Sequence, residues 1–351
     1  MVALAIMTGE VDRLIYESEI APWLPPEIID IHTHIGLREN CGPISRDRQA
    51  QNWALEVGLW QSWTQLRETY ASLFPRQRVS ALVFGTVLPE ADFTSENAYV
   101  MDGARDTRNK AWALFATRPE WSARMIEDAM SSGFLGIKPY PDLAPQATTE
   151  VSICDFVPRD HLKILNEFGG ILMLHLPRKA RIADPDNIRE LLEIAESYPS
   201  IKLIVAHIGR AYCLPTAKKG LPPLVDAKGI YFDTAANVNP EVFQYALEIV
   251  GPDRILFGSD LPIMLMRGTR EHDGEKYANF TNGSYSWNTN RRSSEEEAGY
   301  TYFIYEELRA LIRACEATGY GKDTFRKIMY ANARDLLGIY AHSSSSLLSA
   351  G

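Results

Sequence analysis

Eight short apolar or β-branched runs alternate with segments of helical periodicity, and this alternation constrains the fold of the chain more than any other feature. The runs are 28–34, 79–86, 112–117, 134–138, 171–175, 203–207, 230–234 and 254–260. Helical periodicity marks 122–131, 160–168, 187–197 and 241–250. Two of these helices have a strong start signal, a capping residue followed by proline, at Asp184-Pro185 and Asn239-Pro240. Eight alternating units predict an α/β chain that closes into a (β/α)₈ TIM barrel.

The alternative to a barrel is a doubly wound open sheet. No glycine-rich phosphate loop follows the first strand, so the barrel is favoured. The 351 residues suit one domain over residues 1–340, because barrels commonly use roughly 200 to 400 residues. The serine-rich end, 341–351, is predicted to be a disordered tail.

Two segments exceed what a minimal barrel needs. Residues 46–74, with Trp53, Trp60 and Trp63, are predicted to form a helical insertion after the first strand. This insertion either adds core packing or roofs the pocket, because loops after barrel strands lie on the catalytic face. The polar segment 261–298 follows the eighth strand and is predicted to be a long loop.

The charge of the chain limits its partners. Lys and Arg total 36 against 45 Asp and Glu, which gives a net charge of −9 at pH 7. An acidic chain repels nucleic acid and anionic membranes, so the expected partner is a small-molecule substrate. A homo-oligomer is left open.

The expected compartment is the cytoplasm. Four cysteines without a CxxC pair fit a reducing environment. The apolar start 1–7 is too short for a signal peptide, and no run is long enough to span a membrane.

Histidines and one aspartate stand at the ends of predicted strands. His32 and His34 are two residues apart near the end of the first strand, so both imidazoles face the same side, the interior mouth of a barrel. Two neutral imidazoles that converge there suit a divalent ion such as zinc. His175, His207 and Asp260 also end apolar runs, where an unused polar group would be costly to bury. Together these five residues predict a metal site.

The same residues resemble a known family. Ile29-Asp30-Ile31-His32-Thr33-His34, followed in order by His175, His207 and Asp260, resembles the amidohydrolase superfamily, in the amidohydrolase-related branch that includes aminocarboxymuconate semialdehyde decarboxylase. The segments 136–139, 206–210 and 328–338 are similar to that branch as well, and the resemblance runs from 28 to 339. Tyr140 departs from the branch, which often has histidine there, and this leaves the substrate open.

The resemblance implies a role for each of these residues. It implies a metal held by His32, His34, His175 and Asp260, with zinc expected first and manganese second. A divalent ion lowers the pKa of bound water to roughly 7, and Asp260 can take that water's proton as general base. His207 is implied to be an acid, a base or an oxyanion stabiliser beside the metal.

Three basic residues are candidates for substrate binding. Lys138 ends a strand, where it is either a carbamate that bridges two metals, a cation for a substrate carboxylate, or the partner of a structural acid. Arg178 and Arg210 each lie three residues past a strand-ending histidine. Each either faces the mouth and holds an anion by bidentate contacts or lies in a surface loop. His161, predicted on a helix surface, receives no role.

Three functions compete. The preferred one is hydrolysis of a C–N or C–O bond, in an amide, lactone or ester, by metal-activated water. The alternative is a lyase that decarboxylates an unsaturated or aromatic acid without oxidation at the same metal. A non-enzymatic metal-binding barrel is the third, and His207 together with Asp260 argues against it, because a scaffold needs neither an acid nor a base.

Overall fold

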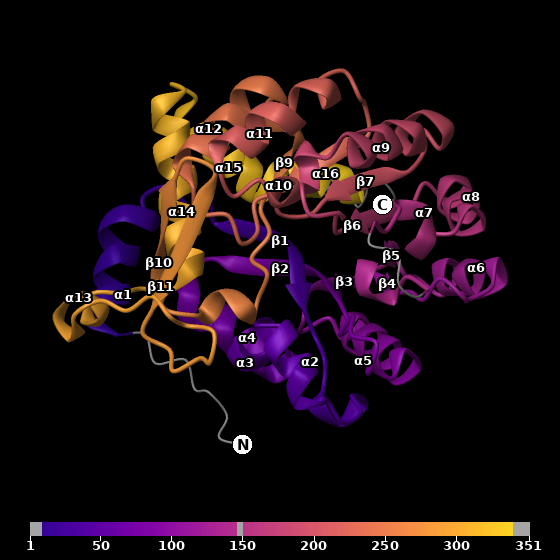
Figure 1. The fold of residues 1–351 in the computed structure, drawn as a ribbon, viewed down its shortest axis with the longest axis horizontal. Helices are drawn as coiled ribbons and strands as arrows, with labels where there is room; N and C mark the ends of the chain where they lie inside the picture. Colours follow the sequence, from indigo (N-terminus) through magenta and orange to yellow (C-terminus); the bar gives the residue numbers. More distant parts are fainter. Residues whose placement is uncertain (1–8, 146–149, 340–351) are drawn as a thin grey trace, which may run out of the picture.

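A computed structural model describes residues 9–145 and 150–339 of the chain, so the predicted tail at 341–351 lies outside the described residues. The described part folds into parallel strands surrounded by helices (Figure 1). The strands are β1 Glu27–His34, β2 Arg78–Phe84, β3 Ala111–Ala113, β4 Phe115–Ala116, β5 Gly136–Lys138, β6 Ile171–Leu174, β7 Lys202–Val205, β8 Ile230–Asp233, β9 Ile255–Leu256, β10 Gly268–Asp273 and β11 Lys276–Thr281.

Helices cover the outside of the strands and also form part of both insertions. They are α1 Glu10–Ile15, α2 Arg46–Gln51, α3 Ala54–Val57, α4 Trp63–Leu73, α5 Phe93–Arg105, α6 Ala123–Ser131, α7 Ile153–Phe156, α8 Arg159–Phe168, α9 Pro185–Ser197, α10 His207–Arg210, α11 Leu214–Gly220, α12 Pro240–Ile249, α13 Ser294–Ala298, α14 Phe303–Ala317, α15 Gly321–Arg326 and α16 Asn332–Leu337. Two π-helical turns are also present, Tyr16–Ile20 and Lys327–Ala331.

The strands follow one another in sequence order, as a TIM barrel requires. β3 and β4 are two parts of one bent strand, interrupted at Leu114, and they correspond to the predicted run 112–117. The ring closes between its last and first strands, because the amide of Ile31 donates to Phe257 O (2.9 Å) and that of Asp260 donates to His32 O (2.8 Å). The predicted strands and the barrel are confirmed.

The predicted helix starts are also present. The Asp184 side chain accepts from the amides of Asp186 and Asn187 at the start of α9. The Asn239 side chain accepts from the amide of Glu241 at the start of α12. Each cap satisfies donors that the first helical turn leaves free.

The segment 261–298 is not the long loop that its polarity predicts. It contains an antiparallel hairpin in which β10 pairs residue for residue with β11, from Gly268 opposite Thr281 to Asp273 opposite Lys276. The hairpin was missed because β10 carries polar residues on both faces, so it lacks the apolar alternation that marks a half-buried strand. Helix α13 follows. The predicted insertion after β1 is confirmed as the helices α2, α3 and α4.

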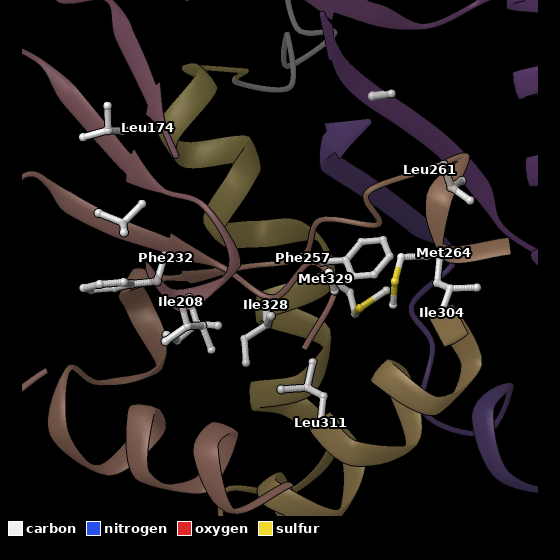
Figure 2. Close-up of a cluster of buried hydrophobic side chains, with 14 of the residues drawn as sticks. Leu174, Ile208, Phe232, Phe257, Leu261, Met264, Ile304, Leu311, Ile328 and Met329 are labelled. Carbon is white, nitrogen blue, oxygen red and sulfur yellow. The ribbon is translucent and has the colours of Figure 1, made fainter. Parts of the chain in front are cut away.

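A large apolar core fills the space between the strands and the C-terminal helices. Figure 2 shows members of this core from β6, β8, the segment after β9, α14 and the turn 327–331: Leu174, Phe232, Phe257, Leu261, Leu311, Ile328 and Met329. All seven are at most 1% exposed, so this side of the barrel is held rigidly. Among the described residues, no helix has both the length and the apolar character needed to cross a membrane.

Candidate metal centre and active site

His32 and His34 lie on β1 and face the same cavity, as their spacing predicts. Their ring centroids are 5.8 Å apart, and both rings pack edge-on against Phe84 of β2. Both imidazoles are buried. The strand therefore presents two nitrogen donors from one face into a site with little water.

Asp260 completes a group that can hold a metal. Its Oδ1 lies 3.3 Å from His34 Nε2 and 3.6 Å from His32 Nε2. One ligand atom from each of the three residues lies within 4.8 Å of the other two. Burial alone would raise the pKa of Asp260, but its hydrogen bond with His34 and the charge of His207 hold that pKa well below its usual range. Imidazole and ionised carboxylate are donors that zinc and manganese accept, so the residues fit a divalent metal.

Asp233, at the end of β8, orients the first of these imidazoles. Its Oδ2 lies 2.9 Å from His32 Nδ1. A carboxylate accepts only from a protonated nitrogen, so His32 carries its proton on Nδ1 and keeps the lone pair of Nε2 for the metal side. The other oxygen accepts from the amides of His207 (2.7 Å) and Ala235 (3.2 Å). Sequence reasoning missed Asp233, although it also ends an apolar strand.

His207 lies at the start of a left-handed turn. His207, Ile208, Gly209 and Arg210 have φ values of 58°, 49°, 62° and 61°. Residues three apart share one side of such a turn, and His207 and Arg210 both line the cavity. His207 Nδ1 donates to the carbonyl of Ala235 (2.9 Å), which leaves Nε2 free to take up or release a proton.

His175 follows β6, and its ring lies next to that of His207. Its ring centroid is 5.0 Å from that of His207 and 4.9 Å from that of Tyr140. Burial lowers the pKa of His175 well below its usual range, so the imidazole is neutral and able to bind a metal. His175 lines the same cavity but is not part of the close group of His32, His34 and Asp260. Its role as a ligand stays a prediction.

Lys138 ends β5 inside the same cavity. Its Nζ is 4.6 Å from the centroid of the Phe84 ring, and no hydrogen-bond acceptor is within reach among the residues described. Burial lowers the pKa of Lys138 to about 8, although Asp233 and Asp260 oppose this shift. A buried cation without an acceptor is available to an anionic ligand.

The two arginines proposed for substrate binding separate in the structure. Arg210 lines the cavity, whereas Arg178 does not. The Arg178 guanidinium is bound to Glu190 and Asn187, each at 2.7 Å. Arg178 is therefore assigned to the anchoring of α9 rather than to the mouth. The sequence could not show this, because Glu190, the acid that binds Arg178, lies 12 residues later, within α9.

The cavity measures about 340 Å³, a size suited to a small molecule. Trp53, from the insertion after β1, packs at 5.7 Å between ring centroids against Trp287, and both line the cavity. The roof predicted from the insertion is therefore present, while Trp63 is buried and serves core packing. The hairpin adds Arg270, Tyr277 and Asn279 to the lining, which the sequence did not indicate.

Comparisons with known proteins agree with this geometry. Residues 29–339 match the family described as amidohydrolase. A 6-methylsalicylic acid decarboxylase from Penicillium expansum is 35% identical over a segment that covers 20% of this chain and only 26% of that protein.

Two solved structures are similar along nearly the whole chain. One is 5-carboxyvanillate decarboxylase from Novosphingobium aromaticivorans, complexed with manganese and 4-hydroxy-3-methoxy-5-nitrobenzoic acid. It is 15% identical with a TM-score of 0.56, over 97% of this chain and 100% of that one. The other, a probable 2-pyrone-4,6-dicarboxylic acid hydrolase from Acinetobacter baumannii, is 14% identical with a TM-score of 0.55, over 89% and 99%. At these identities the likeness shows the fold alone.

The first prediction concerns metal content. Purified wild-type protein is expected to bind about one divalent metal per chain, and His32→Ala is expected to lose it because a nitrogen donor is deleted. His161→Ala is the matched control, since His161 is buried outside the cavity, contrary to its predicted surface position, and bonds to Trp121 O. Elemental analysis measures the metal content of the wild type and of both variants, and melting curves verify that the variants fold. Metal retained by a folded His32→Ala variant would contradict the site, and a wild-type ratio near two would support a carbamate at Lys138.

The second prediction concerns the left-handed turn. A Cβ at Gly209 would lie 2.6 Å from Ile182 Cβ, whereas one at Gly169, which has nearly the same φ, meets nothing nearer than 3.8 Å. Gly169→Ala should lower the free energy of unfolding by about 1–2 kcal/mol, the cost of the left-handed backbone. Gly209→Ala should lower it by about 1–3 kcal/mol more, because overpacking is added. Urea titrations compare the two, and equal losses would show that Ile182 yields without strain.

Proposed function

This chain belongs to the amidohydrolase family, and we propose that it is a metal-dependent enzyme that releases CO₂, without oxidation, from a small aromatic or unsaturated carboxylic acid. One observation carries the proposal. The cavity brings the His32, His34 and Asp260 group together with unpaired cations and with flat aromatic walls from Tyr140, Tyr212 and Trp287. Such a cavity suits a flat acid, and the similarity to 6-methylsalicylic acid decarboxylase supports this class of reaction.

The residues divide the work of substrate binding. His32, His34 and Asp260 would hold the metal, with His175 as a further donor. A bound zinc or manganese ion would act as a Lewis acid toward the oxygens of the substrate. Lys138 lines the same cavity, and the charges of Asp233 and Asp260 both act on its ammonium group. We assign Lys138 to the carboxylate that leaves as CO₂.

We assign the delivery of the proton to His207. In decarboxylation the bond between the carboxylate carbon and the ring breaks, its electron pair stays on the ring carbon, and a proton forms the new C–H bond. His207 Nε2 can carry that proton into the cavity because Nδ1 is held by Ala235 O. Burial lowers the pKa of His207, and the charges of Asp260 and Asp233 oppose this shift.

Hydrolysis of a C–N or C–O bond is the second candidate. It is favoured by the ionised Asp260, which faces the cavity and can take a proton from water. A similar fold in a protein described as a probable 2-pyrone-4,6-dicarboxylic acid hydrolase supports this candidate. The same residues would then act on water rather than on a ring carbon.

A substrate panel separates the two reactions. Zinc-loaded and manganese-loaded protein is incubated with hydroxybenzoates and unsaturated acids, and in parallel with lactones and esters of similar size. Mass spectrometry together with a CO₂ assay should show loss of CO₂ from at least one acid and no addition of water to the esters. Protein treated with a chelator is the control. Addition of water without release of CO₂ would reverse the assignment in favour of hydrolysis.

The final prediction for this site separates metal binding by Asp260 from proton transfer. Asp260→Asn keeps an oxygen for the metal but loses the negative charge, so it should retain much of its metal. It should lose at least about 10²-fold in kcat, because Asp260 takes the proton from water in hydrolysis and its charge supports proton transfer by His207 in decarboxylation. His32→Ala should lose metal and activity together, because no donor replaces the imidazole. Circular dichroism verifies that both variants fold. Near-native kcat in a fully loaded Asp260→Asn enzyme would remove Asp260 from proton transfer in either reaction.

A further inference from the structure

We propose that the cavity contains a second anion-binding subsite, formed by Arg270 of the β10–β11 hairpin together with Arg210, and that the substrate is accordingly a dicarboxylate. The inference rests on the proposed function for the position of the first carboxylate, beside Lys138 and the metal ligands. It adds a distal recognition site in which Arg270 comes from the segment after β9 and Arg210 from the turn after β7.

Arg270 is held in place by aromatic rings. Its guanidinium carbon lies 4.7 Å from the centroid of Tyr212 and 4.8 Å from that of Tyr277. These two rings are nearly perpendicular, with centroids 5.3 Å apart. The side chain thus loses little further conformational entropy when a ligand binds, because its position is already fixed.

The guanidinium keeps donors for a ligand. Arg270 Nε donates to Asn279 Oδ1 (2.8 Å) and Nη1 donates to Ala236 O (2.8 Å). A guanidinium has five N–H donors, so these two bonds use less than half of them. Arg270 lines the cavity, and a planar fork of this kind matches a carboxylate.

No acid neutralises Arg270. Across 9–145 and 150–339, no carboxylate oxygen lies within 4.0 Å of its nitrogens, and the same holds for Arg210 and Lys138. Two arginines nearby are paired with acids: Arg292 lies 2.6 Å from Glu271 and Arg267 is bound to Asp12. Arg181 packs 5.1 Å from the Tyr212 centroid and donates to Arg210 O, but it lies outside the cavity lining. Lys138, Arg210 and Arg270 line the cavity, where a ligand can supply the missing negative charge.

Arg210 lines the same cavity as Arg270, and its carbonyl accepts from the amide of Tyr212 (3.0 Å). Its Nε is buried and has no hydrogen-bond partner within the part of the chain that the structure describes. Burial raises the pKa of Tyr212, and the charges of Arg210 and Arg270 both oppose that rise, as expected if both cations lie near its hydroxyl. Of the arginines around Tyr212, Arg210 and Arg270 line the cavity and Arg181 does not, so these two can form a site for one carboxylate.

The charges in the cavity favour two carboxylates over one. Asp260 is the acidic residue that lines the cavity, against Lys138, Arg210 and Arg270. With a divalent metal bound, a monocarboxylate would leave several positive charges uncompensated in a site of low dielectric, where each unpaired charge is costly. A dicarboxylate supplies one anionic group at each end of the cavity.

The test measures binding, not turnover. Metal-loaded protein is titrated with isophthalate and its monomethyl ester, and with terephthalate and its monomethyl ester, by calorimetry and by the fluorescence of Trp53 and Trp287. Wild-type protein should bind at least one diacid about tenfold or more tightly than its monoester, because the ester lacks the second charge. Arg270→Gln should reduce this preference to about twofold or less while leaving monoester affinity and metal content unchanged.

Arg292→Gln is the matched control, since Arg292 also packs on an aromatic ring, Phe280 at 4.1 Å, yet lies outside the cavity lining. It should keep the full preference. Three results would overturn the proposal. They are an Arg270→Gln variant that keeps the preference, an Arg270→Gln variant that loses both ligands with a lowered Tm, and a wild-type protein without a preference. Diacid preference without any release of CO₂ would leave the subsite standing while the proposed reaction fails. Release of CO₂ without that preference would leave the proposed reaction standing while the subsite fails.

Discussion

The buried carboxylate of Asp233 is the interaction on which the active site depends. One of its oxygens fixes the tautomer of His32, and the other binds the amide of His207, so a single side chain ties the ends of β1, β7 and β8 together. Burial raises the pKa of Asp233 to about 6, which reflects what it costs to place this charge in the interior. Three hydrogen bonds offset that cost, and they do so only in the native arrangement of the three strands.

Backbone strain is concentrated in residues around this site. His207, Arg210, Ala236 and Asp260 all have left-handed backbones although none is glycine. Such conformations cost about 1–2 kcal/mol each. The surrounding core stabilises them: Glu307 of α14 accepts from Thr234 Oγ1 (2.9 Å) and from the amide of Ala236 (3.2 Å), so a helix outside the barrel holds the connection after β8 in its strained form. The rigid core is thus what keeps the cavity residues oriented.

The sequence predicts the barrel and the grouping of His32, His34 and Asp260 well, because both follow from local signals. Apolar runs mark strands, and a polar residue at the end of a run marks the carboxyl end where barrel sites form. The assignments of Arg178 and of the β10–β11 segment were wrong for a physical reason in each case. Arg178 is paired with Glu190 from α9, a contact that spacing cannot show, and the hairpin lacks apolar alternation. Asp233 carried the same signal as Asp260 but has its effect through His32, which only geometry reveals.

The hairpin and the barrel chemistry meet at residues 235 and 236. Arg270 donates to the carbonyl of Ala236, and the neighbouring carbonyl of Ala235 accepts from His207 Nδ1. The arginine proposed for distal recognition and the imidazole proposed for proton transfer are therefore bound to adjacent peptide units. The amide of Ala236 is bound to Glu307, so α14 also holds this connection. Arg270 and His207 are thus anchored to the same short segment after β8.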